Sequence, residues 1–164
     1  MIGQKMQEAL NKQINAELYS AYIYLSMAAY LQSVNLPGAA HWMHIQFGEE
    51  QEHALKIFEF LNDRGGRVKL QAIDQPQTEW KSMLDVFQAA LEHERKVSGM
   101  IHDLYALAVT EKDYPAQVML QWFIDEQVEE EKNASDIVEK LKRIGDNSGL
   151  LLMLDNQLGA REEG

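Results

Sequence analysis

The sequence predicts an all-α protein, a bundle of four long helices followed by a short fifth helix. Two observations support this fold. Apolar residues recur at the alternating three-and-four spacing that gives a helix one buried face, and they do so over four long stretches. Pro37, Pro76 and Pro115 and the glycine-containing segments 64–67 and 145–149 fall at the edges of those stretches or between them. The expected helices cover 4–33, 38–64, 79–109, 115–144 and 149–158, within a single domain spanning residues 1–164.

The composition is that of a globular protein that attracts cations. Hydrophobic residues make up 46% of the 164 residues and charged residues 25%, so a sizeable core is expected. The formal net charge of -11 argues against nucleic-acid binding, which depends on Lys and Arg at phosphates. Cysteine is absent from the sequence, which excludes disulfides, iron–sulfur clusters and thiolate nucleophiles.

Nothing in the sequence predicts a membrane segment. Residues 1–8 turn polar at once and contain no apolar signal core. The apolar run 150–154 is far shorter than the roughly 20 residues that span a bilayer. We therefore expect no membrane partner and a cytoplasmic location.

Each of the four long helices carries an apolar stripe that polar residues interrupt. In the first two helices the stripes read Leu10, Ile14, Glu17, Ala21, Tyr24, Ala28 and Leu31, and Met43, Phe47, Glu50, His53, Ile57 and Phe60. In the third and fourth they read Met83, Phe87, Ala90, Glu94, Val97, Ile101, Leu104 and Ala108, and Leu120, Phe123, Gln127, Glu130, Ala134, Ile137, Leu141 and Ile144. The interrupting residues have side chains of the kind that bind metals.

The connections predict the topology. Short turns near Leu36 and Lys112 make the first helix antiparallel to the second and the third antiparallel to the fourth. About 14 irregular residues between the second and third helices reach about 45 Å when extended, and a helix of about 27 residues is about 40 Å long. The connection can therefore cross the bundle lengthwise. The result is an up-down-down-up order, in which all four polar interruptions lie at one level.

In the bundle interior, four carboxylates then meet beside one imidazole: those of Glu17, Glu50, Glu94 and Glu130, and that of His53. Buried carboxylates without partners are strongly unfavourable, and no Lys or Arg lies on the stripes at that level. A hydrogen-bonded polar layer that specifies helix register is one interpretation, but it leaves several charges unneutralised. Two divalent cations neutralise four carboxylates. Oxygen ligands with one imidazole suit iron or manganese, and zinc also binds them.

The spacing Glu50-x-x-His53 places both side chains on one helical face, and carboxylates from the other helices complete a di-iron pattern. With the segments 15–22, 44–53 and 122–131, the chain resembles the haem-free bacterial and archaeal branch of the ferritins over essentially its whole length. The resemblance implies a ferritin-like bundle that forms a homo-oligomeric, 24-subunit hollow shell. It also implies a ferroxidase that oxidises Fe(II) to Fe(III) with O2 or H2O2 and stores ferric oxyhydroxide inside the shell.

Carried over residue by residue, the resemblance implies that Glu17, Glu50 and His53 hold the first iron. Glu50 bridges to a second iron, which Glu94 and Glu130 hold. These five residues are the expected catalytic and metal-binding groups of a di-iron centre.

A third iron site typical of this branch matches four glutamates: Glu49, Glu126, Glu129 and Glu130. An ordinary solvated acidic face is the alternative for the first three. Gln127 lies where the family has an amide beside the paired irons, and an amide that merely fills a gap is the alternative there.

Tyr24 and Trp122 are candidate electron donors during oxidation, with plain packing as the alternative for both. Haem is not expected, because haem-bearing bacterioferritins have a methionine where this chain has Gln51. The acidic channel positions of animal ferritins, on the threefold axes, correspond to Gln117 and Leu120, so the resemblance supplies no iron route through those channels.

Two other functions stay open: a catalytically silent subunit that nucleates mineral, and a different di-iron carboxylate oxidoreductase. The intact ligand set argues against the first. Rubrerythrin-type peroxidases add a cysteine-ligated iron domain, which this chain cannot form. Mini-ferritins of the Dps type take ligands from the first two helices, which leaves Glu94 and Glu130 unexplained. We also expect the short fifth helix to pack at a fourfold axis of the shell.

Overall fold

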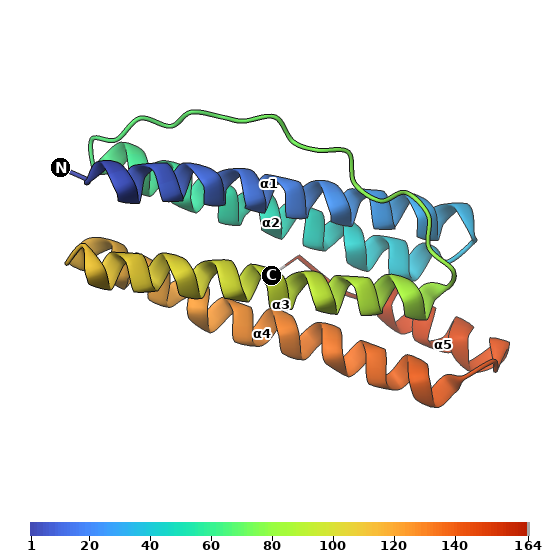
Figure 1. Ribbon diagram of the computed structural model, residues 1–164. Coiled ribbons are helices and arrows are strands. Elements are labelled where there is room, and N and C mark those ends of the chain that lie inside the picture. Colours follow the sequence, from blue (N-terminus) through green and yellow to red (C-terminus); the bar gives the residue numbers. More distant parts are fainter. Residues whose placement is uncertain (164) are drawn as a thin grey trace.

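The computed structural model describes residues 1–163, and its helices confirm the expected all-α fold. They are α1 (Gln4–Ser33), α2 (Pro37–Asp63), α3 (Met83–Thr110), α4 (Tyr114–Ile144) and α5 (Ser148–Gly159). Figure 1 shows that α1 pairs with α2 and α3 with α4, while the segment 64–82 runs along the bundle and makes α2 parallel to α3. The up-down-down-up order is therefore confirmed. In the described part of the chain, no helix is both long and apolar enough to cross a membrane.

The third helix begins at Met83 rather than at residue 79, because a cap ends the extended chain there. The hydroxyl of Ser82 accepts the backbone N–H of Asp85 at 3.1 Å, and the Asp85 carboxylate accepts the N–H of Lys81 at 2.9 Å. Trp80 precedes this cap and is nevertheless buried, with its ring 5.6 Å from that of Tyr30. Trp80 therefore contributes to the core from the extended chain, before the helix begins.

Side chains of α1 hold the segment 64–82 against the bundle. The amide of Asn11 donates to the carbonyl of Arg67 at 2.9 Å and accepts the N–H of Lys69 at 2.7 Å. Near the other end of the segment, the hydroxyl of Ser26 donates to the carbonyl of Gln77 at 2.6 Å. These bonds satisfy backbone groups that have no helical partner, so the extended segment stays close to α1.

The core consists of two apolar clusters separated by a layer of polar side chains. One cluster, which includes Phe87 and Leu141, lies toward α5, and the other, which includes Leu10 and Phe123, lies toward the opposite end of the bundle. The polar layer consists of side chains that are at most 5% exposed: Glu17, Gln46, Glu50, His53, Glu94, Ser98, Gln127 and Glu130. All four long helices contribute to it, at the one level that the stripes predict.

Helix α5 packs against the start of α2, which lacks a cap of its own. The carboxylate of Asp155 accepts the backbone N–H groups of Gly38 at 3.1 Å and Ala39 at 2.8 Å. Leu154 and Leu158 are buried beside it. Asp155 therefore supplies from a distant helix the N-terminal cap that α2 needs, because a carboxylate satisfies unpaired N–H groups at the positive end of the helix dipole.

Candidate metal centre

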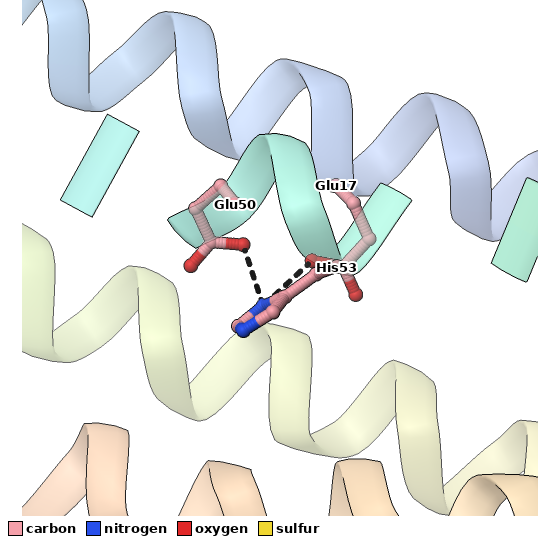
Figure 2. Close-up of side chains that lie close together, drawn as sticks. All are labelled: Glu17, Glu50 and His53. Atoms are coloured by element: carbon pink, nitrogen blue, oxygen red, sulfur yellow. Dashed lines mark ion pairs between the residues drawn. The ribbon is translucent and has the colours of Figure 1, made fainter. Parts of the chain in front are cut away.

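Three side chains of the polar layer face one another in Figure 2: Glu17 from α1, and Glu50 and His53 from α2. Nδ1 of His53 lies 3.3 Å from Oε2 of Glu50 and 3.9 Å from Oε2 of Glu17. Glu50 and His53 share a face because they are one helical turn apart. Glu17 meets them because α1 and α2 are antiparallel neighbours.

These three atoms have no hydrogen-bond partner, although all of them are buried. Unpaired polar atoms in a protein interior are unfavourable, and three that converge on one point require an explanation. One atom from each residue lies within 4.8 Å of the others, a separation that allows a single cation to touch all three. Two carboxylate oxygens and an imidazole nitrogen suit a divalent transition metal such as iron.

A second group of possible ligands lies on the other side of the same imidazole. Atoms of His53, Glu126 and Glu130 lie within 4.8 Å of one another, and Nε2 of His53 is 3.9 Å from Oε1 of Glu126. Glu130 is buried and accepts a hydrogen bond from the amide of Gln46 at 2.9 Å. His53 thus belongs to both groups and places them next to each other.

Glu94 belongs to the same layer but to neither group. The hydroxyl of Tyr24 donates to one of its carboxylate oxygens, and the Gln127 amide donates to the other at 3.1 Å. The same amide donates to the Glu94 carbonyl and to the hydroxyl of Ser98, each at 3.1 Å. Gln127 and Tyr24 therefore orient Glu94 from both sides.

The electrostatics of the layer favour proton uptake in the absence of cations. Burial, followed by the charge of neighbouring carboxylates, raises the pKa of Glu50 well above its usual value. Burial raises the pKa of Glu94 to about 7, although the bonds from Tyr24 and Gln127 oppose the shift. Burial and the charge of Glu94 raise the pKa of Glu130 to about 8. Burial also raises the pKa of Tyr24, so its hydroxyl stays protonated and donates.

An open cavity of about 570 Å³ adjoins the layer, and we call it the acidic cavity. Its lining includes His53 together with Glu49, Glu126 and Glu129. Burial raises the pKa of Glu126, and the charges of Glu129 and Glu49 raise it further, although His53 opposes them. Three of the four predicted third-site glutamates, Glu49, Glu126 and Glu129, therefore line one cavity, whereas Glu130 lies in the buried layer. Glu49 also forms an ion pair with Arg161 at 3.0 Å.

Trp122 also lines the acidic cavity, and its ring lies 5.4 Å from the ring of His53. The Lys56 ammonium lies over the Trp122 ring, 4.3 Å from its centroid. Leu120, which the resemblance matches to a channel position of animal ferritins, is fully buried within the subunit. The stripe that contains Leu120 faces the core.

The sequence reading missed two buried amides that position the carboxylates. Gln13 donates to Glu17 at 3.0 Å, and Gln46 donates to Glu130 at 2.9 Å. A signal was present, since Gln13 and Gln46 each precede a ligand-type residue of their own helix by one turn and therefore share its face.

Comparisons with known proteins agree with this geometry. A family model described as a ferritin-like domain matches residues 7–144. A bacterial non-heme ferritin from Bacteroides fragilis is 44% identical over 98% of this chain and 100% of its own, and one from Staphylococcus aureus is 37% identical over 98% of this chain and 97% of its own. The crystal structure of an open-pore ferritin from Archaeoglobus fulgidus superposes with a TM-score of 0.98 at 52% identity, covering 99% of this chain and 100% of that one. The chain belongs to the ferritin family.

Proposed function

We propose that this protein stores iron and is a ferroxidase. It binds Fe(II) as a substrate at the polar layer, oxidises it to Fe(III) with O2 or H2O2, and releases the product as ferric oxyhydroxide into a hollow homo-oligomeric shell. The observation that carries the proposal is the convergence of three buried, unpaired ligand atoms, from Glu17, Glu50 and His53. Membership of the ferritin family and relatives named non-heme ferritin support iron as the metal.

Each residue of the proposed site has a distinct task. Glu17, Glu50 and His53 hold the first Fe(II), and Glu50 bridges to a second, which Glu94 and Glu130 hold. Gln13, Gln46 and Gln127 keep the carboxylates in place by donating hydrogen bonds. A total of four carboxylates balances two dications, so the loaded interior is close to neutral.

The site also accounts for the protons and electrons of the reaction. Each Fe(II) gives up one electron, so two ions reduce one H2O2 to water and four reduce one O2. Binding of Fe(II) displaces protons held by Glu94 and Glu130, whose pKa values are about 7 and about 8. Hydrolysis of Fe(III) to oxyhydroxide releases further protons, and hard carboxylate ligands favour the ferric state. Tyr24 and Trp122 are the proposed electron donors, and the hydroxyl of Tyr24 donates a hydrogen bond to Glu94.

The acidic cavity provides the proposed exit from the site. His53 lies between the buried group and the cavity, where Glu126, Glu129 and Glu49 offer carboxylates for a third iron. A cation that leaves the buried layer therefore meets a second set of oxygen ligands before it reaches solvent. We propose that this third site passes Fe(III) on toward the mineral.

The proposal is tested by adding Fe(II) to the protein without oxygen and then admitting air. We expect a fast di-ferric absorbance transient in the wild type and its loss in Glu94→Ala, with oxidation at least about tenfold slower because one metal loses its buried ligand. Glu92→Ala is the matched control, since Glu92 is an exposed carboxylate on the same helix. If the wild type shows no transient but still collects mineral, the chain is a silent shell subunit instead.

A further inference from the structure

The chain beyond α5 turns back along the bundle and contacts α2 beside the acidic cavity (Figure 1). Nη2 of Arg161 donates to both carboxylate oxygens of Glu49, at 3.0 and 3.1 Å. Its Nη1 donates to the carbonyl of Trp42 at 3.4 Å, and the guanidinium lies over the Trp42 ring, 4.5 Å from the centroid. Nε2 of His41 lies 2.8 Å from the Arg161 carbonyl oxygen. Arg161 is thus anchored at three residues of α2.

This anchoring makes the ion pair more than a chance surface contact. The side chains of Arg161 and Glu49 are only 20% and 27% exposed, so water screens them incompletely. The guanidinium of Arg161 is already held against the indole of Trp42, so it loses little further conformational freedom when it pairs with Glu49. The pair is therefore expected to persist in solution.

Glu49 differs in this respect from the other glutamates of the cavity. Glu126 and Glu130 lie with His53 in a group that a single cation can bridge, whereas Glu49 does not belong to that group. Both of its oxygens already accept bonds from Arg161. A carboxylate in that state cannot offer the same lone pairs to a metal, and the fixed positive charge of Arg161 repels a cation that approaches.

We propose that Arg161 is a positioning residue that competes with metal for Glu49 and thereby delays the filling of the third iron site. The inference rests on the function proposed above for the polar layer and the acidic cavity. Arg161 forms hydrogen bonds and an ion pair with α2 residues other than Glu50, and none with Glu17 or Glu94, so we expect the paired site to fill independently of it. The third metal binds only after Arg161 has left Glu49. The end of the chain therefore separates iron binding into an early step and a late step.

The test is a calorimetric titration of Zn²⁺, which cannot be oxidised, into the assembled, metal-stripped protein. We expect Arg161→Gln to bind the third Zn²⁺ per subunit about threefold more tightly than the wild type, and the first two with unchanged affinity, since a partly exposed ion pair of this kind is broken on binding. Arg161→Lys keeps the positive charge but loses the planar guanidinium, so we expect its affinity for the third Zn²⁺ to lie between those of the wild type and Arg161→Gln. Lys5→Gln is the matched control, because it removes a Lys that pairs with Glu111 at the far end of the bundle.

A double variant separates competition from general loosening of the chain end. Glu49→Gln is expected to abolish the third binding event, and Arg161→Gln is expected to add nothing in that background. An unchanged or weaker third event in Arg161→Gln overturns the inference, as does the absence of a third event from every variant. Failure of the first two Zn²⁺ ions to bind any variant contradicts the proposed function and the inference with it. Circular dichroism checks that each variant keeps its helices.

Discussion

At the residue scale, the centre of the molecule is a set of carboxylates that the fold keeps away from water and from Lys and Arg side chains. Glu17, Glu50 and Glu94 are each 1% exposed, and amides or a phenol, not Lys or Arg, donate to Glu17 and Glu94. Such groups either hold protons or hold cations. In the proposed function, Fe(II) is the cation that replaces the protons on these carboxylates.

The first prediction follows from the raised pKa values. An unfolded Glu has a pKa near its usual 4.5, whereas Glu94 has a pKa of about 7 and Glu130 of about 8. Between these values the folded chain keeps protons that the unfolded chain releases, so the stability of metal-stripped protein falls as pH rises from about 5 to about 8. We expect a loss on the order of a few kcal/mol, measured as a falling calorimetric unfolding temperature.

Neutral variants provide the control for this pH dependence. Glu94→Gln and Glu130→Gln each remove a group that titrates in the window, so the decline in unfolding temperature should become shallower. Excess Zn²⁺ should remove most of the decline in unfolding temperature of the wild type, because a bound cation favours the ionised carboxylates. A metal-stripped wild type whose stability rises between pH 5 and pH 8 would contradict the electrostatic account.

The sequence predicted the residues of the polar layer better than their contacts. Ligand-type residues interrupt otherwise apolar stripes, so Glu17, Glu50 and Glu94 could be placed at one level by helical periodicity alone. Which oxygen accepts from which donor depends on side-chain rotamers, and periodicity does not contain that information. The Arg161–Glu49 pair joins positions 112 residues apart, and no local pattern could indicate it.

At the element scale, the junction between α2 and α5 depends on the absence of one side chain. A Cβ atom on Gly38 would lie 1.8 Å from the carbonyl oxygen of Asp155, which belongs to the backbone of α5 and cannot move alone. Gly38 therefore allows α5 to approach closely enough for Asp155 to cap α2. The sequence placed Gly38 only at the start of the second helix and gave no reason for a glycine there, because the partner that requires it lies more than a hundred residues away.

The second prediction concerns this junction. Gly38→Ala should displace α5 and destabilise the protein by about 1–3 kcal/mol, the usual range for overpacking a close contact. The measurement is thermal unfolding, together with faster proteolytic cleavage within α5. Gly99→Ala is the matched control, because a Cβ at Gly99 in α3 meets nothing within 4 Å. That control should instead be stabilising by about 0.5–1 kcal/mol, since alanine favours helix.

The helices themselves were predicted well because their signals are local. Prolines, turns and apolar spacing placed the ends of α1 correctly and those of α2, α4 and α5 within a residue, whereas α3 began late because of its cap. The cap signal, Ser82 followed by Asp85, was present in the sequence, and the predicted apolar stripe itself begins only at Met83, although the helix was expected from residue 79.

At the scale of the whole molecule, one surface of α5 remains apolar after the subunit has folded. Leu152 and Met153 are 56% and 67% exposed, although α5 buries Leu154 and Leu158 against the bundle. An exposed apolar face on a short terminal helix is a candidate contact between subunits. It agrees with the proposed homo-oligomeric shell, in which we expect α5 to pack at the fourfold axes.

The third prediction tests that contact without unfolding the subunit. Leu152→Lys combined with Met153→Lys places charges on the exposed face, and we expect light scattering to detect smaller species than the full shell. Removal of residues after Gly149 should have the same effect more severely, because it also removes Leu154 and Leu158 from the core. Removal of residues 162–164 alone is the control and should leave assembly intact. A full-size shell formed by the double Lys variant would place α5 outside the subunit contacts.

The division of the core has a consequence for how the subunit withstands stress. Two separate apolar clusters lie on either side of the polar layer, so the packing of each subunit is weakest at that layer. The proposed Fe(II) ions would link side chains from all four long helices at this layer. On the function proposed above, we expect a subunit that has bound Fe(II) to be more rigid than a metal-stripped subunit, and we expect the metal-stripped protein to be cleaved faster by proteases.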